Sequence, residues 1–374
     1  MTFETFETDT IIVGAGPAGL SVGASLRRTG ARFIMLERGQ RVGESWRGHY
    51  KRLHLHTPKR HSALPYRPFP ADYPTYPSKD QMVAYLEDYA RTFELQPEFG
   101  RIVRQCTRDG DGRWVVSTDP GEYRAHNVVM ASGLSRIPNR PRWPGEEMFR
   151  GTIIHSSDYK DGEPFGGKRV LVIGFGNTGA EIALDLLEYG AECTISVRGK
   201  VNVIPRDLLG IPIIVFALLW RSLPPRVADA MNALTLRLAI GNLAKLGLEK
   251  RDDGPITEIV ESRQIPVLDV GTLARIKSGE IKVRKGVQSF DGSEVHFADG
   301  TREPFDAVIL ATGYRSGMAS MFPQDSHILD AEGVPRGVAE GLYFCGYDVS
   351  KARAGLLRHI GAEARQIAEA ISRN

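Results

Sequence analysis

Two stretches of the chain show the same order of hydrophobic runs, glycine-rich turns and helical periodicity. The β-branched run TIIV precedes GAGPAG near the N-terminus, and VLVI precedes GFGNTG in the middle of the chain. After each turn the apolar residues recur at helical spacing, which predicts helices over 17–29 and 177–189. A further apolar run follows each helix and predicts strands over 32–37 and 192–197.

The two stretches are copies of one plan, separated by a constant 160 residues. The three glycines of each turn keep this offset: Gly14, Gly16 and Gly19 correspond to Gly174, Gly176 and Gly179. Downstream of each copy, strand-like runs separated by Asp-Gly turns lead to an apolar strand that ends in ASG (131–133) or ATG (311–313). The pattern predicts an α/β fold with two Rossmann-like domains, each carrying a β-meander.

The spacing G-x-G-x-x-G between a strand and a helix is typical of a turn that binds a pyrophosphate. The first glycine permits the bend, the second lets the backbone approach the phosphates, and the third lets the helix pack closely on the strand. The N-terminal amides of the helix then face the anion. One such motif is weak evidence, because some glycine turns only permit packing. Two of them, each between a strand and a helix, predict two dinucleotide sites.

The end of the second strand distinguishes the two nucleotides. In the first copy Glu37 stands there, and its carboxylate would accept hydrogen bonds from ribose hydroxyls and repel a 2′-phosphate. In the second copy the same position is Val197, followed by Arg198, whose guanidinium can pair with a 2′-phosphate. We therefore expect a resident FAD in the first half and NADPH in the second, with a solvated surface charge as the alternative role of Arg198.

Length and composition narrow the class of protein. With 374 residues, 42% hydrophobic and 25% charged, the chain fits two soluble globular domains. The net charge of +3 gives no reason to expect a nucleic-acid partner. Cys106, Cys193 and Cys345 are far apart, which argues against a disulfide framework, a metal site or a dithiol redox centre. We expect buried thiols and a cytoplasmic protein.

The N-terminus and the most apolar run bear on targeting and membranes. The first ten residues are acidic and lack Lys and Arg, unlike a targeting signal. The run 208–220 has 13 residues and contains Pro212, so it is shorter than the roughly 20 residues of a spanning helix. We expect a buried segment or a channel wall and no transmembrane segment. The wider region 208–248 leaves a channel, a dimer contact or a membrane surface open.

Between the two halves lies FRGTIIHSSDY, residues 149–159. Here the chain resembles the class B flavoprotein monooxygenases, whose fingerprint F-x-G-x-x-x-H-x-x-x-Y is met by Phe149, Gly151, His155 and Tyr159. The related Baeyer–Villiger fingerprint has Trp where this chain has Tyr159, which counts against a ketone oxygenase. Within the linker we expect His155 to fix the chain by hydrogen bonds rather than to handle substrate protons.

Within that group, the chain resembles the YUCCA flavin monooxygenases, the indole-3-pyruvate oxidases of auxin synthesis. The resemblance spans nearly the whole chain and is carried by YKRLHLHTPK (50–59), YPTYPSKDQMVAYLEDYA (73–90), PVLDVGTLARIKSGEIKV (266–283) and VILATGYRS (308–316). It implies an enzyme that uses FAD, NADPH and O₂ and acts through a flavin peroxide. The implied small-molecule substrate is an aryl 2-oxo acid such as indole-3-pyruvate, which would lose CO₂.

The glycine turns and the resemblance together assign candidate residues to each cofactor. For FAD these are Gly14, Gly16, Pro17, Ala18, Gly19, Glu37, Arg38, Trp46, His56, Val103, Ala131 and Gly346. For NADP they are Gly174, Gly176, Asn177, Thr178, Gly179, Arg198, Ser156, Ser157, Ala311, Thr312 and Gly313. The resemblance places Trp46, Arg52 and His56 along the flavin domain near the isoalloxazine ring. His56 and Arg52 are the candidate catalytic residues, and Arg52 and Lys59 are the candidate cations for a substrate carboxylate.

The repeat also predicts the domain boundaries. We expect a discontinuous FAD domain, residues 1–160 and 305–374, with the NADPH domain, residues 161–304, inserted between its parts. Oxygenation of sulfur or nitrogen, Baeyer–Villiger oxidation of another small molecule, and a non-catalytic NADP-sensing flavoprotein remain alternatives, and a homo-oligomer is left open. A pyridine nucleotide–disulfide reductase would share the architecture, but the sequence lacks its dithiol pair.

Overall fold

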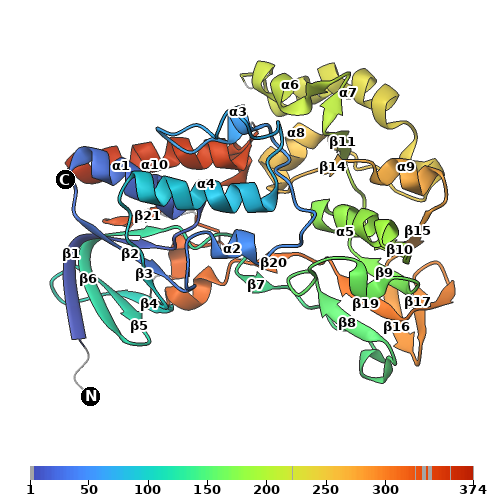
Figure 1. Ribbon diagram of the computed structural model, residues 1–374, viewed down its shortest axis with the longest axis horizontal. Coiled ribbons are helices and arrows are strands. Elements are labelled where there is room, and N and C mark those ends of the chain that lie inside the picture. Colours follow the sequence, from blue (N-terminus) through green and yellow to red (C-terminus); the bar gives the residue numbers. More distant parts are fainter. Residues whose placement is uncertain are drawn as a thin grey trace. The chain divides into compact units, whose positions relative to one another are not determined.

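The computed structural model describes residues 4–220, 222–324, 326–330, 334–335, 339–353 and 355–373 (Figure 1). The chain divides into two compact units. The first unit comprises Met1–Gly48, Thr57–Ile137 and Tyr314–Asn374, and the second comprises His49–His56 and Pro138–Gly313. We call His49–His56 the strap, because this short segment belongs to the second unit although the first unit flanks it on both sides in sequence.

The first unit is built on a seven-stranded sheet with the order β3-β2-β1-β6-β5-β4, in which β21 also pairs with β6. Its strands are β1 (Glu4–Val13), β2 (Phe33–Glu37), β3 (Glu98–Phe99), β4 (Val103–Arg108), β5 (Trp114–Thr118), β6 (Gly121–Met130) and β21 (Leu342–Phe344). Strands β2, β1, β6 and β21 run parallel, whereas β4, β5 and β6 form an antiparallel meander. The predicted meander is therefore part of the main sheet here.

The helices of the first unit are α1 (Pro17–Thr29), α2 (Glu44–Arg47), α3 (Lys59–Ser62), α4 (Lys79–Thr92) and α10 (Leu356–Arg373). Helix α1 has the predicted bounds: it begins with Pro17, whose fixed φ suits a first helical position, and ends before Gly30, whose φ is 79°. A capping box between Ser78 and Gln81 starts α4. Helix α1 contacts both α4 and α10, and Figure 1 shows the three helices along one side of the sheet.

The second unit is built on a five-stranded parallel sheet with the order β15-β10-β9-β19-β8. Its strands are β8 (Thr152–His155), β9 (Arg169–Ile173), β10 (Glu192–Val197), β15 (Ile281–Lys285) and β19 (Ala307–Leu310). Here the meander β16 (Val287–Asp291), β17 (Glu294–Phe297) and β18 (Arg302–Pro304) forms a separate three-stranded sheet. The two copies thus share their parallel strands and differ in how the meander is attached.

Further elements complete the structure. The helices are α5 (Asn177–Glu188), α6 (Ile213–Leu219), α7 (Pro225–Ile240), α8 (Pro255–Thr257) and α9 (Thr272–Lys277). The short strands are β7 (Ile137–Pro138), β11 (Val203–Pro205), β12 (Asp207–Leu208), β13 (Ile211–Pro212), β14 (Val267–Asp269) and β20 (Tyr314–Arg315). Strands β11 and β14 pair in parallel, and β12 and β13 form a hairpin.

Alternation along β9 explains how the second sheet is buried on both faces. Val170 and Val172 belong to the apolar cluster that includes Ile182 of α5, whereas Leu171 belongs to the cluster that includes Phe290 of the small sheet. Successive side chains of a strand point to opposite faces, so a continuous apolar run supplies both cores. This arrangement leaves the carboxyl edge of the sheet to carry polar side chains.

The observed unit boundaries correct the predicted ones. The boundaries at 160/161 and 304/305 would assign β8 and β19 to the FAD domain. Instead β19 pairs with β9, and β8 pairs with β19, so both strands complete the second sheet. The units therefore change at 137/138 and 313/314, and the strap joins the second unit as well.

The apolar run 208–220 is less buried than expected. Of its residues only Ile214 is buried, while Leu209, at the tip of the β12–β13 hairpin, is 96% exposed and Leu219 is 66% exposed. The expectation of a buried segment is therefore wrong for most of this run. No helix in the described part of the chain combines the length and the apolar character that crossing a membrane requires.

Candidate functional site

The first glycine turn joins β1 to α1, and each glycine has a distinct steric reason. Gly14 has a φ of +110°, and a Cβ there would lie 2.6 Å from the carbonyl oxygen of Ala131. A Cβ on Gly19 would lie 1.8 Å from the carbonyl oxygen of Gly14, so the helix packs directly on the turn. A Cβ on Gly16 would meet no atom within 4 Å. The space above Gly16 is the kind that a pyrophosphate needs.

The second turn, between β9 and α5, repeats this geometry. Gly174 has a φ of +112°, and its Cβ would lie 2.4 Å from the carbonyl oxygen of Ala311. A Cβ on Gly179 would lie 2.1 Å from the carbonyl oxygen of Gly174, and one on Gly176 would again meet nothing within 4 Å. Asn177 does not point into this space: its side chain pairs with the carbonyl of Pro266 (3.2 Å) and the amide of Leu268 (2.7 Å). It therefore anchors the turn to β14.

The residues at the carboxyl ends of β2 and β10 differ in charge: an acid in the first copy, and an apolar residue followed by a cation in the second. The Glu37 carboxylate accepts hydrogen bonds from the backbone amides of Ala15 (2.7 Å) and Gly39 (2.8 Å), which fixes it at the rim of the first turn. Its counterpart Val197 is buried and apolar. Arg198 is exposed and forms no ion pair with any residue that the structure describes. A fixed anion in one copy thus corresponds to an available cation in the other.

The remaining FAD candidates of the first unit lie on several of its elements. Gly346 follows β21, its amide donates to Glu363 (2.8 Å), and its Cβ would lie 3.4 Å from that of Ala18 in α1. Val103 is buried in the core at the start of β4. Trp46 is half-buried in the short helix α2, and Arg38 is exposed after β2. Gly346 is thus brought to the glycine turn, whereas Val103 can offer only its backbone.

The candidates after β8 and β19 form a tight polar junction in the second unit. The His155 ring is fully buried; its Nδ1 accepts from the Ser157 amide (3.1 Å), so Nε2–H donates to the Gly313 carbonyl (3.1 Å). Burial lowers the pKa of His155, which favours the neutral ring. Thr312 donates to the carbonyl of Asn139 (2.6 Å). These contacts are those expected of a histidine that fixes the linker.

Ser156 differs from its neighbours. The residue is 4% exposed, and its hydroxyl has no hydrogen-bond partner among the described residues. The backbone amide of Ser156 donates to the carbonyl of Leu310 (3.0 Å), which holds Ser156 at the carboxyl edge of the parallel sheet. A buried hydroxyl without a partner is costly unless a ligand or water supplies one.

The other fingerprint residues have structural roles inside the second unit. The Phe149 ring packs edge-on against Phe290 at 5.3 Å. A Cβ on Gly151 would lie 2.5 Å from the carbonyl oxygen of Asp306, so only glycine fits. The Tyr159 hydroxyl donates to Asp185 of α5 (2.6 Å), and burial raises the pKa of this carboxyl group. The fingerprint therefore describes how the linker is fastened to the second sheet and to α5.

The strap corrects the expected place of two candidates. Arg52 and His56, predicted to lie along the flavin domain, belong to the second unit. Arg52 forms an ion pair with Glu188, and His56 Nε2 contacts the carboxylate of Glu181. Lys59, the other candidate cation, donates to the carbonyls of Pro70, Ala71 and Tyr73, which occupy all three of its N–H groups. Lys59 therefore fastens a loop rather than offering a free charge.

Sequence reasoning missed the residues that receive the strap. Glu181 and Asp185 are both about 5% exposed or less, lie one turn apart on α5, and each accepts a hydrogen bond from a tyrosine. Burial and the neighbouring Glu181 raise the pKa of Tyr50 far above its ordinary value, opposed by a hydrogen bond with Thr178. A comparison of the two copies could have revealed Glu181 and Asp185, because the first copy has the uncharged residues Ser21 and Ser25 at the positions 160 residues earlier.

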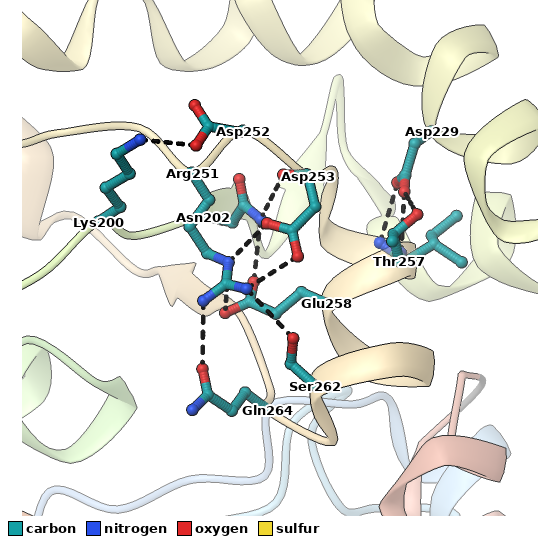
Figure 2. A network of polar contacts seen from close by, with 11 residues as sticks. Lys200, Asn202, Asp229, Arg251, Asp252, Asp253, Thr257, Glu258, Ser262 and Gln264 are labelled. Atoms are coloured by element: carbon teal, nitrogen blue, oxygen red, sulfur yellow. Dashed lines mark hydrogen bonds and ion pairs between the residues drawn. The ribbon is translucent and has the colours of Figure 1, made fainter.

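A polar network fixes the chain that follows Arg198 (Figure 2). Arg251 donates to both carboxylate oxygens of Asp253 through Nε (2.7 Å) and Nη2 (2.8 Å), and Asn202 donates to Glu258 (3.0 Å). Burial raises the pKa of Glu258, with the hydrogen bond from Asn202 opposing it. Lys200 is held by Asp252 at 2.6 Å. Arg198 forms no contact within this network.

The cysteines do not form a redox centre. Cys106, Cys193 and Cys345 are all buried and free, and burial raises the pKa of each thiol. Among the described residues, no cluster of three or more His, Cys, Asp or Glu side chains could hold a metal ion. The arrangement that remains is two open glycine turns at the carboxyl ends of the parallel strands in the two sheets, where α/β folds bind ligands.

Comparison with solved structures agrees with this fold. The chain is similar to a flavin-containing monooxygenase from Stenotrophomonas maltophilia, with a TM-score of 0.75, 23% identity, and coverage of 98% of this chain and 99% of that one. It is also similar to an oxidized steroid monooxygenase bound to NADP, with a TM-score of 0.76, 20% identity, and coverage of 98% and 85%. At these identities the likeness concerns the fold alone.

Sequence comparison is more specific. Residues 11–207 match the family described as pyridine nucleotide–disulphide oxidoreductase. The chain is 43% identical to the indole-3-pyruvate monooxygenase YUCCA1 of Oryza sativa subsp. japonica, over 89% of this chain and 83% of the relative. It is 42% identical to the indole-3-pyruvate monooxygenase YUCCA6 of Arabidopsis thaliana, over 88% and 81%. The chain therefore belongs to the YUCCA family of flavin monooxygenases.

Proposed function

We propose that the protein oxidatively decarboxylates an aryl 2-oxo acid, with indole-3-pyruvate as the substrate to test first. The balanced reaction consumes the 2-oxo acid, O₂, NADPH and one proton and yields the shortened carboxylic acid, CO₂, NADP⁺ and water. The observation that carries the proposal is the relatives' identity of 38–43% over most of the chain, together with two glycine turns. As a member of this family, the protein is an NADPH-dependent flavoprotein monooxygenase.

The residues of the first unit fit FAD. The open space above Gly16 suits a pyrophosphate, and the Glu37 carboxylate, already oriented by two backbone amides, has lone pairs left for ribose hydroxyls. We assign Ala131 and Gly346 to the walls of this site, since both lie against the turn. Bound FAD supplies the oxygen chemistry once NADPH has reduced it. The protein's part is to hold and orient the cofactor and to exclude water.

The residues of the second unit fit NADPH in the same way. Gly176 leaves room for the pyrophosphate, and Thr178 lies in the first turn of α5, where backbone amides face an anion. We assign the 2′-phosphate to Arg198, which is exposed and lies beyond the apolar Val197. The unpartnered hydroxyl of Ser156 is a donor for the nucleotide at the same carboxyl edge.

His56 is the residue we propose for proton handling. Glu181 contacts its Nε2, and within the described part of the chain its Nδ1 has no hydrogen-bond partner. A histidine oriented by a carboxylate, with its second nitrogen available, can give or accept a proton. Arg52 is engaged by Glu188, so a role with a substrate carboxylate would require it to exchange partners.

The substrate is tested by following NADPH and O₂ consumption with indole-3-pyruvate and identifying the product. Formation of indole-3-acetate with one NADPH per product supports the proposal; NADPH oxidation without indole-3-acetate removes the substrate assignment. Panels of thioethers, amines and ketones separate the alternative oxygenations. Flavin binding without any oxygen transfer would instead indicate a sensing protein.

The NADPH assignment has a separate test with a matched control. Replacing Arg198 with Ala removes a charge-assisted contact of about 1.5–3 kcal/mol, which corresponds to a roughly 10- to 100-fold weaker affinity for NADPH. The affinity for NADH, which lacks the 2′-phosphate, should hardly change. Lys200→Ala is the control, because Asp252 already engages this nearby ammonium. Equal losses for the two nucleotides in R198A would contradict the phosphate assignment.

A further inference from the structure

The strap is fastened to the second unit by side-chain and backbone contacts along most of its length. The Lys51 amide donates to the Lys160 carbonyl (2.8 Å), and the Lys51 ammonium pairs with Asp161 (2.6 Å). Arg52 pairs with Glu188, and Leu53 packs against the core of the unit. The chain therefore leaves the first unit after Gly48, docks on the second, and returns at Thr57.

Glu181 is the buried centre of these contacts. Its side chain is 6% exposed, one carboxylate oxygen accepts from the Tyr50 hydroxyl (3.2 Å), and the other contacts His56 Nε2. A buried carboxylate without partners is strongly destabilising, and both of these partners come from the strap. Undocking the strap would therefore leave an uncompensated charge inside the unit.

The first copy of the fold shows that the helix does not need such an acid. The residue 160 positions before Glu181 is Ser21, whose hydroxyl donates back to the carbonyl of Pro17 in its own helix (2.7 Å). The residue 160 positions before Asp185 is Ser25, which donates back to Ser21 (2.8 Å). The acid is thus specific to the copy on which the strap docks.

Tyr50 links the same acid to the nucleotide turn. Its hydroxyl donates to Glu181, which lies three residues after Thr178 on α5, and the Thr178 side chain lowers the pKa of Tyr50 against the larger effect of burial. Thr178 is the second residue of α5, in the turn where the pyrophosphate is proposed to bind. A bound pyrophosphate would add negative charge near the same turn of the helix as Glu181. Loss of the hydrogen-bond donors of the strap would then cost more free energy, because two negative charges would repel each other without compensation. Nucleotide binding and strap docking should therefore favour each other.

We propose that Glu181 is a positioning residue that holds Tyr50 and His56 on α5 and thereby couples docking of the strap to nucleotide binding at the second glycine turn. The coupling rests on the proposed NADPH site, whereas docking itself does not. His56 would then take its working orientation only when the strap is docked. The role is one of positioning, since Glu181 itself is buried away from ligands.

The test measures hydrogen exchange of strap amides and the affinity for NADP⁺ by calorimetry, in the FAD-bound protein. Replacing Glu181 with Ala should speed exchange across residues 49–56 about tenfold or more without nucleotide, and bound NADP⁺ should no longer slow this exchange. Glu181→Gln should retain most of both properties, because a carboxamide can accept from Tyr50 and donate to neutral His56. In the native protein, NADP⁺ should slow exchange of the strap.

The matched control is Glu188→Gln, which loosens Arg52 on the same strap and helix but lies at a side chain that is 58% exposed. Its strap exchange and NADP⁺ affinity should stay within about twofold of native values, as for most surface ion pairs. Tyr50→Phe keeps the acid and removes one of its donors, so it should both speed strap exchange and weaken NADP⁺ binding, and it also serves if E181A fails to fold. Native strap exchange in E181A, or native exchange and native NADP⁺ affinity in Y50F, would overturn the proposal. Failure of the native protein to bind NADP⁺ would instead refute the nucleotide site, while strap exchange would still test docking.

Discussion

Gly176 and Gly179 provide a matched pair of substitutions that separates nucleotide binding from folding. They lie three residues apart in the second turn, and replacing either with Ala adds one methyl group. In Gly179→Ala this methyl would lie 2.1 Å from the carbonyl oxygen of Gly174, a backbone atom that cannot move aside cheaply. In Gly176→Ala it would meet no atom within 4 Å.

The expected stability changes follow from these distances. Overpacking against backbone costs about 3 kcal/mol, and the better helix propensity of alanine returns about 1 kcal/mol, so G179A should lose about 2 kcal/mol. For a unit of this size that corresponds to a melting temperature lower by roughly 4–8 °C. Gly176 has φ −99° and ψ −174°, which alanine adopts readily. The poorer N-cap of alanine costs G176A at most about 1 kcal/mol, or roughly 2–4 °C.

The binding changes should run in the opposite order of severity. The methyl of G176A would occupy the space proposed for the pyrophosphate, so its NADP⁺ affinity should fall at least about tenfold while the protein remains folded. Calorimetric titration with NADP⁺ and thermal unfolding measure the two effects separately. Native NADP⁺ affinity in G176A would refute backbone approach at this turn, and an unchanged melting temperature in G179A would refute the packing argument.

Three further predictions concern single side chains. Burial raises the pKa of Asp185 above its ordinary 3.8, so the native protein loses stability as pH rises through the raised pKa and the carboxyl group ionises. Asp185→Asn should therefore melt at a higher temperature than the native protein at pH 7 but not at pH 4. The same difference in melting temperature at both pH values would contradict this. Burial lowers the pKa of His155 below its ordinary 6.5, so the stability present above pH 6.5 is lost as pH falls through the lower pKa of the folded state. In His155→Asn the melting temperature should therefore depend less on pH below 6.5. An unchanged dependence of melting temperature on pH would argue against this role of burial. Gly16→Ala should fold but retain less flavin after dialysis than the native protein, and full retention would exclude the first turn as the pyrophosphate site.

The parts of the fold that sequence reasoning predicted are those set by local backbone constraints. Helix α1 begins at Pro17 and ends at Thr29 as predicted, because proline and the following glycine define its ends. The two glycine turns were recognisable because a positive φ and a close approach to backbone exclude other residues at Gly14 and Gly174. The family could be predicted because the linker fingerprint and other matching stretches occur in order along the chain.

The parts that sequence reasoning missed depend on contacts between distant residues. The unit boundaries were misplaced because β8 and β19 pair with each other across about 150 residues of chain. Lys59 looked like a free cation, but its three donors are used by carbonyls of a loop more than ten residues away. The strap was assigned to the first unit because nothing local in 49–56 shows that its partners lie on α5.

The two copies therefore differ mainly in where they carry negative charge. The first copy has its acid, Glu37, at the end of β2, where we propose that it accepts from ribose hydroxyls and would repel a 2′-phosphate. The second copy has no acid at that point, which leaves Arg198 available, and instead carries Glu181 on the helix, paired by the strap. An unpaired Glu181 near the same turn would oppose an anionic nucleotide. On the strap proposal, the donors of Tyr50 and His56 offset this repulsion, so the second copy would bind the more highly charged nucleotide with the strap docked.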